Sequence, residues 1–235
     1  MIVHVWTIVR NEAWMLPHFL RHYAQVADRI FVVDDESTDG TRAIAEAHPQ
    51  VTLLNYPYPT GLHEGDLARA YEALTREYSR GHADWVLCPD ADEFLVHADL
   101  RGLLATHQRL GTRALQADGV LCGADEMPET TGPLWEALPY RQAHAAYSKT
   151  IILAADHPVR FGPGRHTTSL PGVRIVPRPG ITLYHCCYLS PAWVEARLAK
   201  NFARIPERPG LAEEEAYRRQ RALAQRWWRP GEPTP

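Results

Sequence analysis

Two aspartates stand directly after a strand-like run in the first half of the chain. Trp85–Cys88 is apolar and predicts a buried strand, and Asp90, Asp92 and Glu93 follow it. In an extended strand end, residues two apart point the same way, so Asp90 and Asp92 are expected to face one cation. Mg²⁺ and Mn²⁺ prefer such oxygen ligands and commonly bridge carboxylates to phosphates. A solvated acidic turn is the alternative, and a lone D-x-D would favour it.

Similar polar loops follow two other predicted strands. Apolar, β-rich runs predict strands, and helical spacing of apolar residues predicts helices; the strands are at 2–9, 29–33, 51–54 and 85–88, and the helices at 12–26, 42–47 and 64–79. Strands that alternate with helices indicate an open α/β sheet, in which ligands bind beyond the carboxyl ends of the strands. The loops Val9–Glu12, Asp34–Ser37 and Asp90–Asp92 are therefore expected to open onto one crevice.

The second half of the chain has a looser pattern. The expected elements are a helix at 100–109, strands near 114–122, 149–154 and 180–185, and a helix within 191–228. Long loops rich in Gly and Pro separate them, and loops of that length are usually functional or mobile. The last seven residues, 229–235, are expected to be a disordered tail.

Composition limits the class of protein. The 235 residues, 45% of them hydrophobic and 23% charged, suit one soluble globular domain. The net charge of −3 gives no basic field for nucleic acid. No apolar run approaches the roughly 18 residues that span a bilayer, and the N-terminus lacks a signal pattern, so a cytoplasmic location is expected. The four cysteines have no metal-site spacing and are expected to be reduced and structural.

Three motifs together carry a resemblance to a known family. The segments "TIVRNE", "VVDDESTDGT" and "WVLCPDADEFL", in this order and at this separation, resemble the glycosyltransferase family 2 superfamily over about residues 2–97. The resemblance implies an α/β fold of the GT-A type: a Rossmann-like, open mixed sheet flanked by helices. It further implies a domain over 1–190, with a nucleotide-binding half at about 1–97 and an acceptor half at 98–190. A helical extension over 191–228 follows.

The resemblance also implies roles for individual residues. In such enzymes the loop after the first strand and the acidic strand tips line the nucleotide-sugar pocket, with Asp35 favoured over Asp34 for reading the base or ribose. The positions that correspond here are Thr7, Val9, Arg10, Asn11, Glu12, Asp34, Asp35, Asp90, Ala91 and Lys149. A turn and helix cap explains Asp39 and Gly40 of the same segment but does not require the acidic pair. Lys149 is either a phosphate partner or a solvated lysine.

A metal ion and a catalytic base complete the expected site. Asp90 and Asp92 would hold Mn²⁺ or Mg²⁺ on the diphosphate, and a C-terminal histidine is often a further ligand in this fold. His185 and His166 are the candidates, although a lone histidine is more often packed or on the surface. Inverting transfer needs a carboxylate to take the acceptor proton, and Glu126 is expected to be that base, with Asp125 as the alternative.

Other aromatic and basic residues leave two interpretations each. Trp135 and Tyr140 either stack on a sugar ring or pack in the core. The basic residues of 191–228, among them Arg197 and Lys200, either dock on the core or contact an anionic membrane surface at the inner face. Docking is the favoured interpretation.

The sequence thus predicts a metal-dependent glycosyltransferase that uses a nucleotide-diphosphate sugar, with uridine favoured as the base. The acceptor and the oligomeric state are not specified by any motif. A sugar-phosphate nucleotidyltransferase is disfavoured, because the loop after the first strand contains no glycine. A non-catalytic nucleotide-sugar binding module stays open as an alternative, since the base is the least securely placed group.

Overall fold

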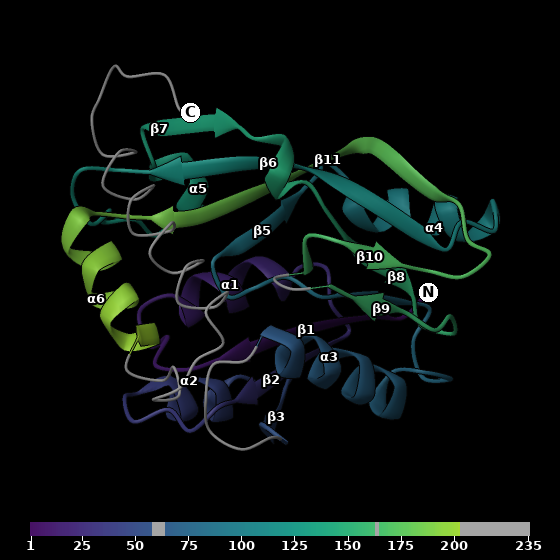
Figure 1. Ribbon diagram of the computed structural model, residues 1–235, viewed down its shortest axis with the longest axis horizontal. Helices are drawn as coiled ribbons and strands as arrows, with labels where there is room; N and C mark the ends of the chain where they lie inside the picture. Colours follow the sequence, from purple (N-terminus) through teal and green to yellow (C-terminus); the bar gives the residue numbers. More distant parts are fainter. Residues whose placement is uncertain (58–63, 163–164, 203–235) are drawn as a thin grey trace.

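The computed structural model describes residues 1–57, 64–162 and 165–202 of the chain (Figure 1). The strands are β1 (Val3–Val9), β2 (Arg29–Asp34), β3 (Val51–Asn55), β4 (Trp85–Leu87), β5 (Glu93–Val96), β6 (Ala114–Gly123), β7 (Tyr140–Ala143), β8 (Lys149–Ala154), β9 (Arg160–Phe161), β10 (Thr168–Ser169) and β11 (Ile175–Tyr188). The helices are α1 (Leu16–Tyr23), α2 (Thr41–Ala47), α3 (Glu64–Tyr78), α4 (Leu100–Arg109), α5 (Leu134–Ala137) and α6 (Pro191–Phe202), with one 3₁₀ turn at Ala145–Tyr147.

One mixed sheet organises the described part of the chain. Its strand order is β3-β2-β1-β4-β8-β6-β11-β5, with β7 beside β6, while β9 and β10 form a separate pair. The first four strands of this order are parallel, and β8 then runs antiparallel to both β4 and β6. The carboxyl ends of β1, β2 and β4 therefore lie at the same edge, as the sequence predicts. Figure 1 shows α3 in front of β1 and α1 behind it.

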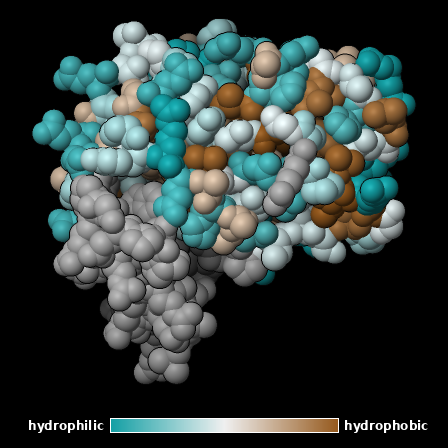
Figure 2. All heavy atoms as spheres, turned by 90° about the horizontal axis from the view of Figure 1, so that it is seen from above, coloured by the Kyte–Doolittle hydropathy of each residue, from teal (hydrophilic) through white to brown (hydrophobic). Residues whose placement is uncertain are grey.

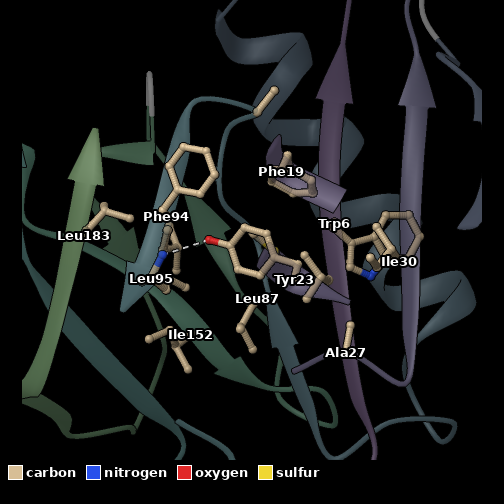
Figure 3. Close-up of a cluster of buried hydrophobic side chains, with 14 of the residues drawn as sticks. Trp6, Phe19, Tyr23, Ala27, Ile30, Leu87, Phe94, Leu95, Ile152 and Leu183 are labelled. Carbon is tan, nitrogen blue, oxygen red and sulfur yellow. Dashed lines mark hydrogen bonds between the residues drawn. The ribbon is translucent and has the colours of Figure 1, made fainter. Parts of the chain in front are cut away.

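The core on the α1 side is held by an aromatic residue that also forms polar contacts. Tyr23 is fully buried, and its ring contacts Phe19 one turn earlier in α1. Its hydroxyl donates to the Glu93 carbonyl (2.9 Å) and accepts from the Leu95 N–H (3.0 Å), as Figure 3 shows for Leu95. These bonds connect α1 to β5, the strand that follows Asp92.

Changing Tyr23 to phenylalanine is expected to lower the free energy of unfolding by about 1–3 kcal/mol, because one buried N–H and one buried C=O lose their partner. Chemical denaturation measures the loss. Tyr78→Phe is the matched control, since Tyr78 lies at the surface and should change stability by less than about 0.5 kcal/mol. An unchanged denaturation midpoint in Tyr23→Phe would show that the hydroxyl does not tie α1 to β5.

Several elements differ from the sequence expectation. The strand β5 was not predicted, because Glu93–Val96 pairs antiparallel with distant residues of β11 and has too few residues for its own periodicity. The first helix begins at Leu16, four residues later than expected, and β11 is longer than the predicted 180–185. Only the start of the predicted 191–228 helix is described, as α6; residues 203–228 and the tail 229–235 lie outside the described residues.

The surface is mixed in polarity. Figure 2 shows one face on which hydrophilic residues predominate and apolar residues gather in a few groups. Among the described residues, no helix has the length and apolarity needed to cross a membrane. Cys88, Cys122 and Cys186 are buried, Cys187 is half-buried, and the four form no disulfide. Burial raises the pKa of the Cys88 thiol to about 12, which suits a structural thiol.

Candidate active site

The loops after β1 and β2 are joined by hydrogen bonds. The Asn11 N–H donates to Ser37 Oγ (2.9 Å), and Asn11 Oδ1 accepts from the Thr38 N–H (2.7 Å). Asn11 and Glu36 have φ values of 51° and 53°, a left-handed conformation that non-glycine residues rarely adopt outside constrained sites. Asp39 Oδ1 accepts from the N–H of Thr41, the first residue of α2 (2.9 Å), while the N-cap position itself is Gly40, which has no side-chain cap. The structure thus brings together two of the three predicted loops.

The two aspartates at the end of β2 have different surroundings. Asp34 is buried against Arg42, whose Nη1 lies 2.8 Å from its Oδ2, and its carboxylate also accepts from the Ser37 N–H (3.3 Å). Asp35 lies on the side of Arg10, whose Nη1 donates to the Asp35 carbonyl (2.8 Å) and lies 3.9 Å from its carboxylate. Asp34 is therefore engaged in holding α2 on the sheet, whereas Asp35 lies with the loop after β1.

The Asp90–Asp92 segment is a turn, which corrects the extended geometry expected from the sequence. The strand β4 ends at Leu87, and the Glu93 N–H donates to the Asp90 carbonyl (3.0 Å), which closes the turn into β5. The Glu93 carboxylate in turn accepts from the Asp90 N–H (3.0 Å). In this turn the two aspartates pair with different cations of the protein.

Asp90 meets two cations from the second half of the chain. Arg165 forms a short ion pair with its Oδ1, and Lys149 Nζ lies 3.4 Å from its Oδ2. Burial opposes ionisation of Asp90, but Arg165 and Lys149 outweigh it and hold the carboxyl pKa well below its usual range. Arg165 also lies over the Tyr71 ring, 4.2 Å from the centroid. Asp90 is therefore a carboxylate at neutral pH.

Asp92 is paired with β11 and α6. Arg197 Nη1 lies 2.8 Å and His185 Nε2 3.3 Å from its Oδ2. Burial again opposes ionisation, and Arg197 and His185 more than compensate, so the Asp92 pKa is well below its usual range. Although burial lowers the pKa of His185, Cys187 and Asp92 raise it well above its ordinary value. Neither oxygen of Asp92 has a properly oriented hydrogen bond within the described residues.

Two more ion pairs adjoin the site, one at Glu93 and one at Glu12 in the loop after β1. Lys149 Nζ is 2.6 Å from Glu93 Oε1, and both side chains are buried. Burial lowers the pKa of Lys149, and Glu93 and Asp90 reverse that effect, so its pKa is raised. On the other side, Lys200 Nζ lies 2.9 Å from Glu12 Oε1 and donates to the Arg10 carbonyl (2.8 Å). The third loop is thus linked to the first through α6.

These side chains form a set that we call the charged cluster. Its carboxylates are Glu12, Asp90, Asp92 and Glu93, and its cations are Lys149, Arg165, Arg197 and Lys200. The four carboxylates match the four lysine and arginine charges, and His185, whose pKa is raised, lies at one side. Sequence reasoning identified neither Arg165 nor the two α6 residues as part of the site. The only sequence signal was the basic character of α6, since ion pairing across such distances in the chain has no local pattern.

Three other residues that were expected to line the pocket are buried. Thr7, Val9 and Ala91 are buried, and Thr7 Oγ1 has no hydrogen-bond partner within the described residues. They lie in β1 and in the turn, so they support the edge and leave the polar contacts to neighbouring side chains.

The described residues include no preformed group of three or more His, Cys, Asp or Glu side chains that could hold a metal. The donor set still fits a divalent ion completed by phosphate oxygens, because such ions often take only one or two carboxylates from the protein. Asp92 has two buried oxygens without hydrogen bonds, next to His185. His166 Nδ1 is 2.9 Å from the Ala146 carbonyl, and both histidine rings contact Tyr147.

The residues expected on the acceptor side follow β6. Asp125 and Glu126 are exposed, and Asp125 accepts a hydrogen bond from the Tyr140 hydroxyl (2.5 Å). Trp135 is buried and stacked on Tyr184, with centroids 5.9 Å apart. Of the two interpretations of Trp135, the structure shows core packing. Tyr140 lies at the surface beside Asp125.

Comparison with known proteins agrees with this geometry. The family model for Glycosyl transferase family 2 matches residues 5–159, more than half of the chain. S. aureus TarS 1-349 has a similar structure, with a TM-score of 0.52 at 15% identity over 97% of this chain and 73% of that chain. TarS 1-349 in complex with UDP-GlcNAc has a TM-score of 0.53 at 14% identity over the same shares of the two chains. No curated protein sequence matches.

The fold and the acidic edge of the sheet define the class of protein: the open mixed sheet is that of the GT-A-type glycosyltransferases, as the sequence predicts. The chain belongs to glycosyltransferase family 2, and it is a glycosyltransferase. The family match includes the three polar loops and Lys149. It ends before Arg165, His185 and α6, whose contacts with Asp90 and Asp92 come from the structure alone.

Proposed function

We propose that this protein transfers a sugar from a nucleotide-diphosphate sugar to an acceptor hydroxyl or similar nucleophile, with a divalent metal bound at the acidic turn and with inversion at the sugar. UDP-sugars are the favoured donors. The observation that carries the proposal is the charge balance of the charged cluster at the carboxyl ends of β1 and β4.

The charge balance supports a donor that arrives with a metal. The diphosphate of a nucleotide sugar carries two negative charges. Once His185 loses its proton to act as a metal ligand, the four lysine and arginine charges of the cluster are matched by its four carboxylates. Binding the diphosphate alone would leave an excess of negative charge in a partly buried site, which is unfavourable. A divalent cation brings the missing two charges and keeps the site neutral.

Asp90 and Asp92 are the proposed metal ligands, with His185 as the favoured third ligand and His166 as the other candidate. Asp92 and His185 are adjacent, and the oxygens of Asp92 lack hydrogen bonds. Mn²⁺ or Mg²⁺ bound there would neutralise the charge of the departing diphosphate. Lys149 and Arg165 pair with the Asp90 carboxylate, so the protein itself keeps Asp90 ionised and fixes its position.

The loops after β1 and β2 are the proposed site for the nucleoside. Asp35, with Arg10 beside it, can accept hydrogen bonds from a ribose or a uracil N–H. Asn11 and Glu12 lie in the same loop after β1, and Arg197 links Glu12 to Asp92. The crystal structure of TarS in complex with UDP-GlcNAc supports uridine as the first base to test.

Glu126 is the proposed catalytic base. Within the described residues its carboxylate has no ion-pair or hydrogen-bond partner, whereas that of Asp125 accepts from Tyr140. Their segment begins beside the C-terminal end of β11, the strand that carries His185, because the Ala124 N–H donates to the Tyr188 carbonyl (2.9 Å). A free carboxylate there suits proton removal from an acceptor.

A nucleotide panel tests this function. The melting temperature of the protein is measured with UDP, GDP, CDP and dTDP, each with and without Mn²⁺. One nucleotide, UDP by expectation, should raise the melting temperature only when Mn²⁺ is present, because ligands that bind the folded state stabilise it by mass action. Release of the nucleotide from the matching sugar donor then separates an enzyme from a non-catalytic binding module. If no nucleotide stabilises the protein under any condition, the proposed function is wrong.

A further inference from the structure

The helix α6 places two cations on two carboxylates of the donor site. Arg197 and Lys200 are three residues apart and so share one face of α6. Arg197 Nη1 lies 2.8 Å from Asp92 Oδ2, and its Nη2 lies 3.8 Å from Glu12 Oε1. Lys200 lies 2.9 Å from the same Glu12 oxygen. In Figure 1, α6 lies at the left end of the sheet, where β11 leads into it.

Arg197 thus pairs with Asp92, a carboxylate that the proposed function assigns to a metal. A guanidinium and a divalent cation both need the Asp92 oxygens, and two cations this close repel each other strongly in a partly buried site. If a metal binds Asp92, Arg197 must therefore take another anion as its partner. The diphosphate that arrives with the metal is the nearest new anion, and planar guanidinium groups bind phosphate oxygens well.

The contacts of these two residues are suited to exchange. The Arg197 and Lys200 side chains are 24% and 22% exposed, whereas Lys149 and Arg165 are only 2% and 4% exposed. Arg197 Nη1 and Asp92 Oδ2 form an ion pair at 2.8 Å without hydrogen-bond geometry, so a better-oriented anion can replace Asp92 as the partner of Arg197. Lys149 and Arg165 are enclosed, whereas the two α6 side chains are partly exposed to solvent.

We propose that Arg197 and Lys200 are diphosphate-binding residues. In the free protein they pair with Asp92 and Glu12, and when the metal–donor complex binds, their side chains leave these carboxylates and pair with the diphosphate of the donor. This inference rests on the proposed function. It has two consequences: the metal competes with Arg197 when no nucleotide is present, and metal and nucleotide bind together far better than either alone.

Binding of Mn²⁺ and UDP to Arg197→Gln tests the exchange. Mn²⁺ binding without nucleotide, followed by electron paramagnetic resonance of the free ion, is expected to tighten by about fivefold or more, since a competing cation has been removed. UDP affinity at saturating Mn²⁺, followed by calorimetry, is expected to weaken by about tenfold or more, the loss of one charge-assisted hydrogen bond. These changes have opposite signs, which a purely structural role of Arg197 would not produce.

Three further variants complete the test. Lys200→Gln should weaken UDP binding but leave Mn²⁺ binding unchanged, because Lys200 contacts Glu12 and not Asp92. Arg197→Lys keeps the charge but not the planar guanidinium, so its UDP affinity should lie between those of the wild type and Arg197→Gln. Arg113→Gln removes an exposed ion pair with Asp156, which is not part of the charged cluster, and should match the wild type in both assays. Melting curves confirm that each variant is folded.

The outcomes separate this inference from the proposed function. If the wild type binds no nucleotide with Mn²⁺, the proposed function itself fails. If the wild type binds UDP with Mn²⁺ but Arg197→Gln has the same Mn²⁺ and UDP affinities as Arg113→Gln, the exchange is wrong and the proposed function stands. If Arg197→Gln weakens Mn²⁺ and UDP binding alike, Arg197 only orders Asp92, and the exchange is again wrong.

Discussion

Replacing Asp92 by asparagine is expected to lower kcat/KM for release of UDP from a UDP-sugar by about 100-fold or more, a loss typical of removing one electrostatic group from an active site. Asparagine keeps the shape of the side chain but removes its charge. Arg197 then remains as a cation without its carboxylate partner, and it opposes the arrival of a metal. The measurement is initial-rate UDP release in Mn²⁺, with UDP binding followed in parallel.

A matched variant makes the Asp92 result specific. Asp156 is exposed and pairs with Arg113 away from the cluster, so Asp156→Asn should change kcat/KM by less than about twofold. Because asparagine at position 92 also weakens a contact of α6, the assay is run well below the melting temperature of each variant. Metal-dependent UDP binding that survives intact in Asp92→Asn would remove Asp92 from the metal site.

The sequence predicted the parts of the fold that repeat locally. The strands β1, β2, β3 and β4 and the helices between them have clear periodicity, and they alternate, so the parallel half of the sheet followed from the pattern. The strand β5 was missed because its partner, β11, lies about 90 residues later in the chain. Its four residues, Glu93–Val96, are too few to show a strand periodicity of their own.

The same distinction applies to the site. Asp35, Asp90 and Asp92 were found because each follows a strand end, and strand ends of a parallel sheet meet at one edge. Arg165, Arg197 and Lys200 come from residues 165–200, where no strand pattern indicates which side chains face the edge. Lys149, Arg165 and Arg197 pair with the carboxylates of the acidic turn, and of these three only Lys149 was a site candidate from the sequence. The proposed metal is additional to these cations.

Replacing Lys149 by methionine is expected to lower the free energy of unfolding by about 3–5 kcal/mol, because it leaves the Glu93 carboxylate buried without its cation. Glu93 is fully buried and lies 2.6 Å from Lys149, whereas Asp90 still has Arg165. Urea denaturation measures the loss. Arg113→Met, which breaks an exposed pair, should cost less than about 1 kcal/mol.

The double variant Lys149→Met/Glu93→Gln tests the cause of that loss. Glutamine keeps an acceptor for the Asp90 N–H but carries no charge, so most of the lost stability should return. A double variant as unstable as Lys149→Met would mean that the lysine chain is needed for packing and that its charge is not. Once stable, the double variant also isolates the second proposed role of Lys149. Its Nζ lies between Glu93 and Asp90, so any effect on UDP affinity must act through Asp90 or through direct phosphate contact. Because Asp90 retains Arg165, a loss of UDP affinity much greater than about tenfold would favour direct contact of Lys149 with the phosphate.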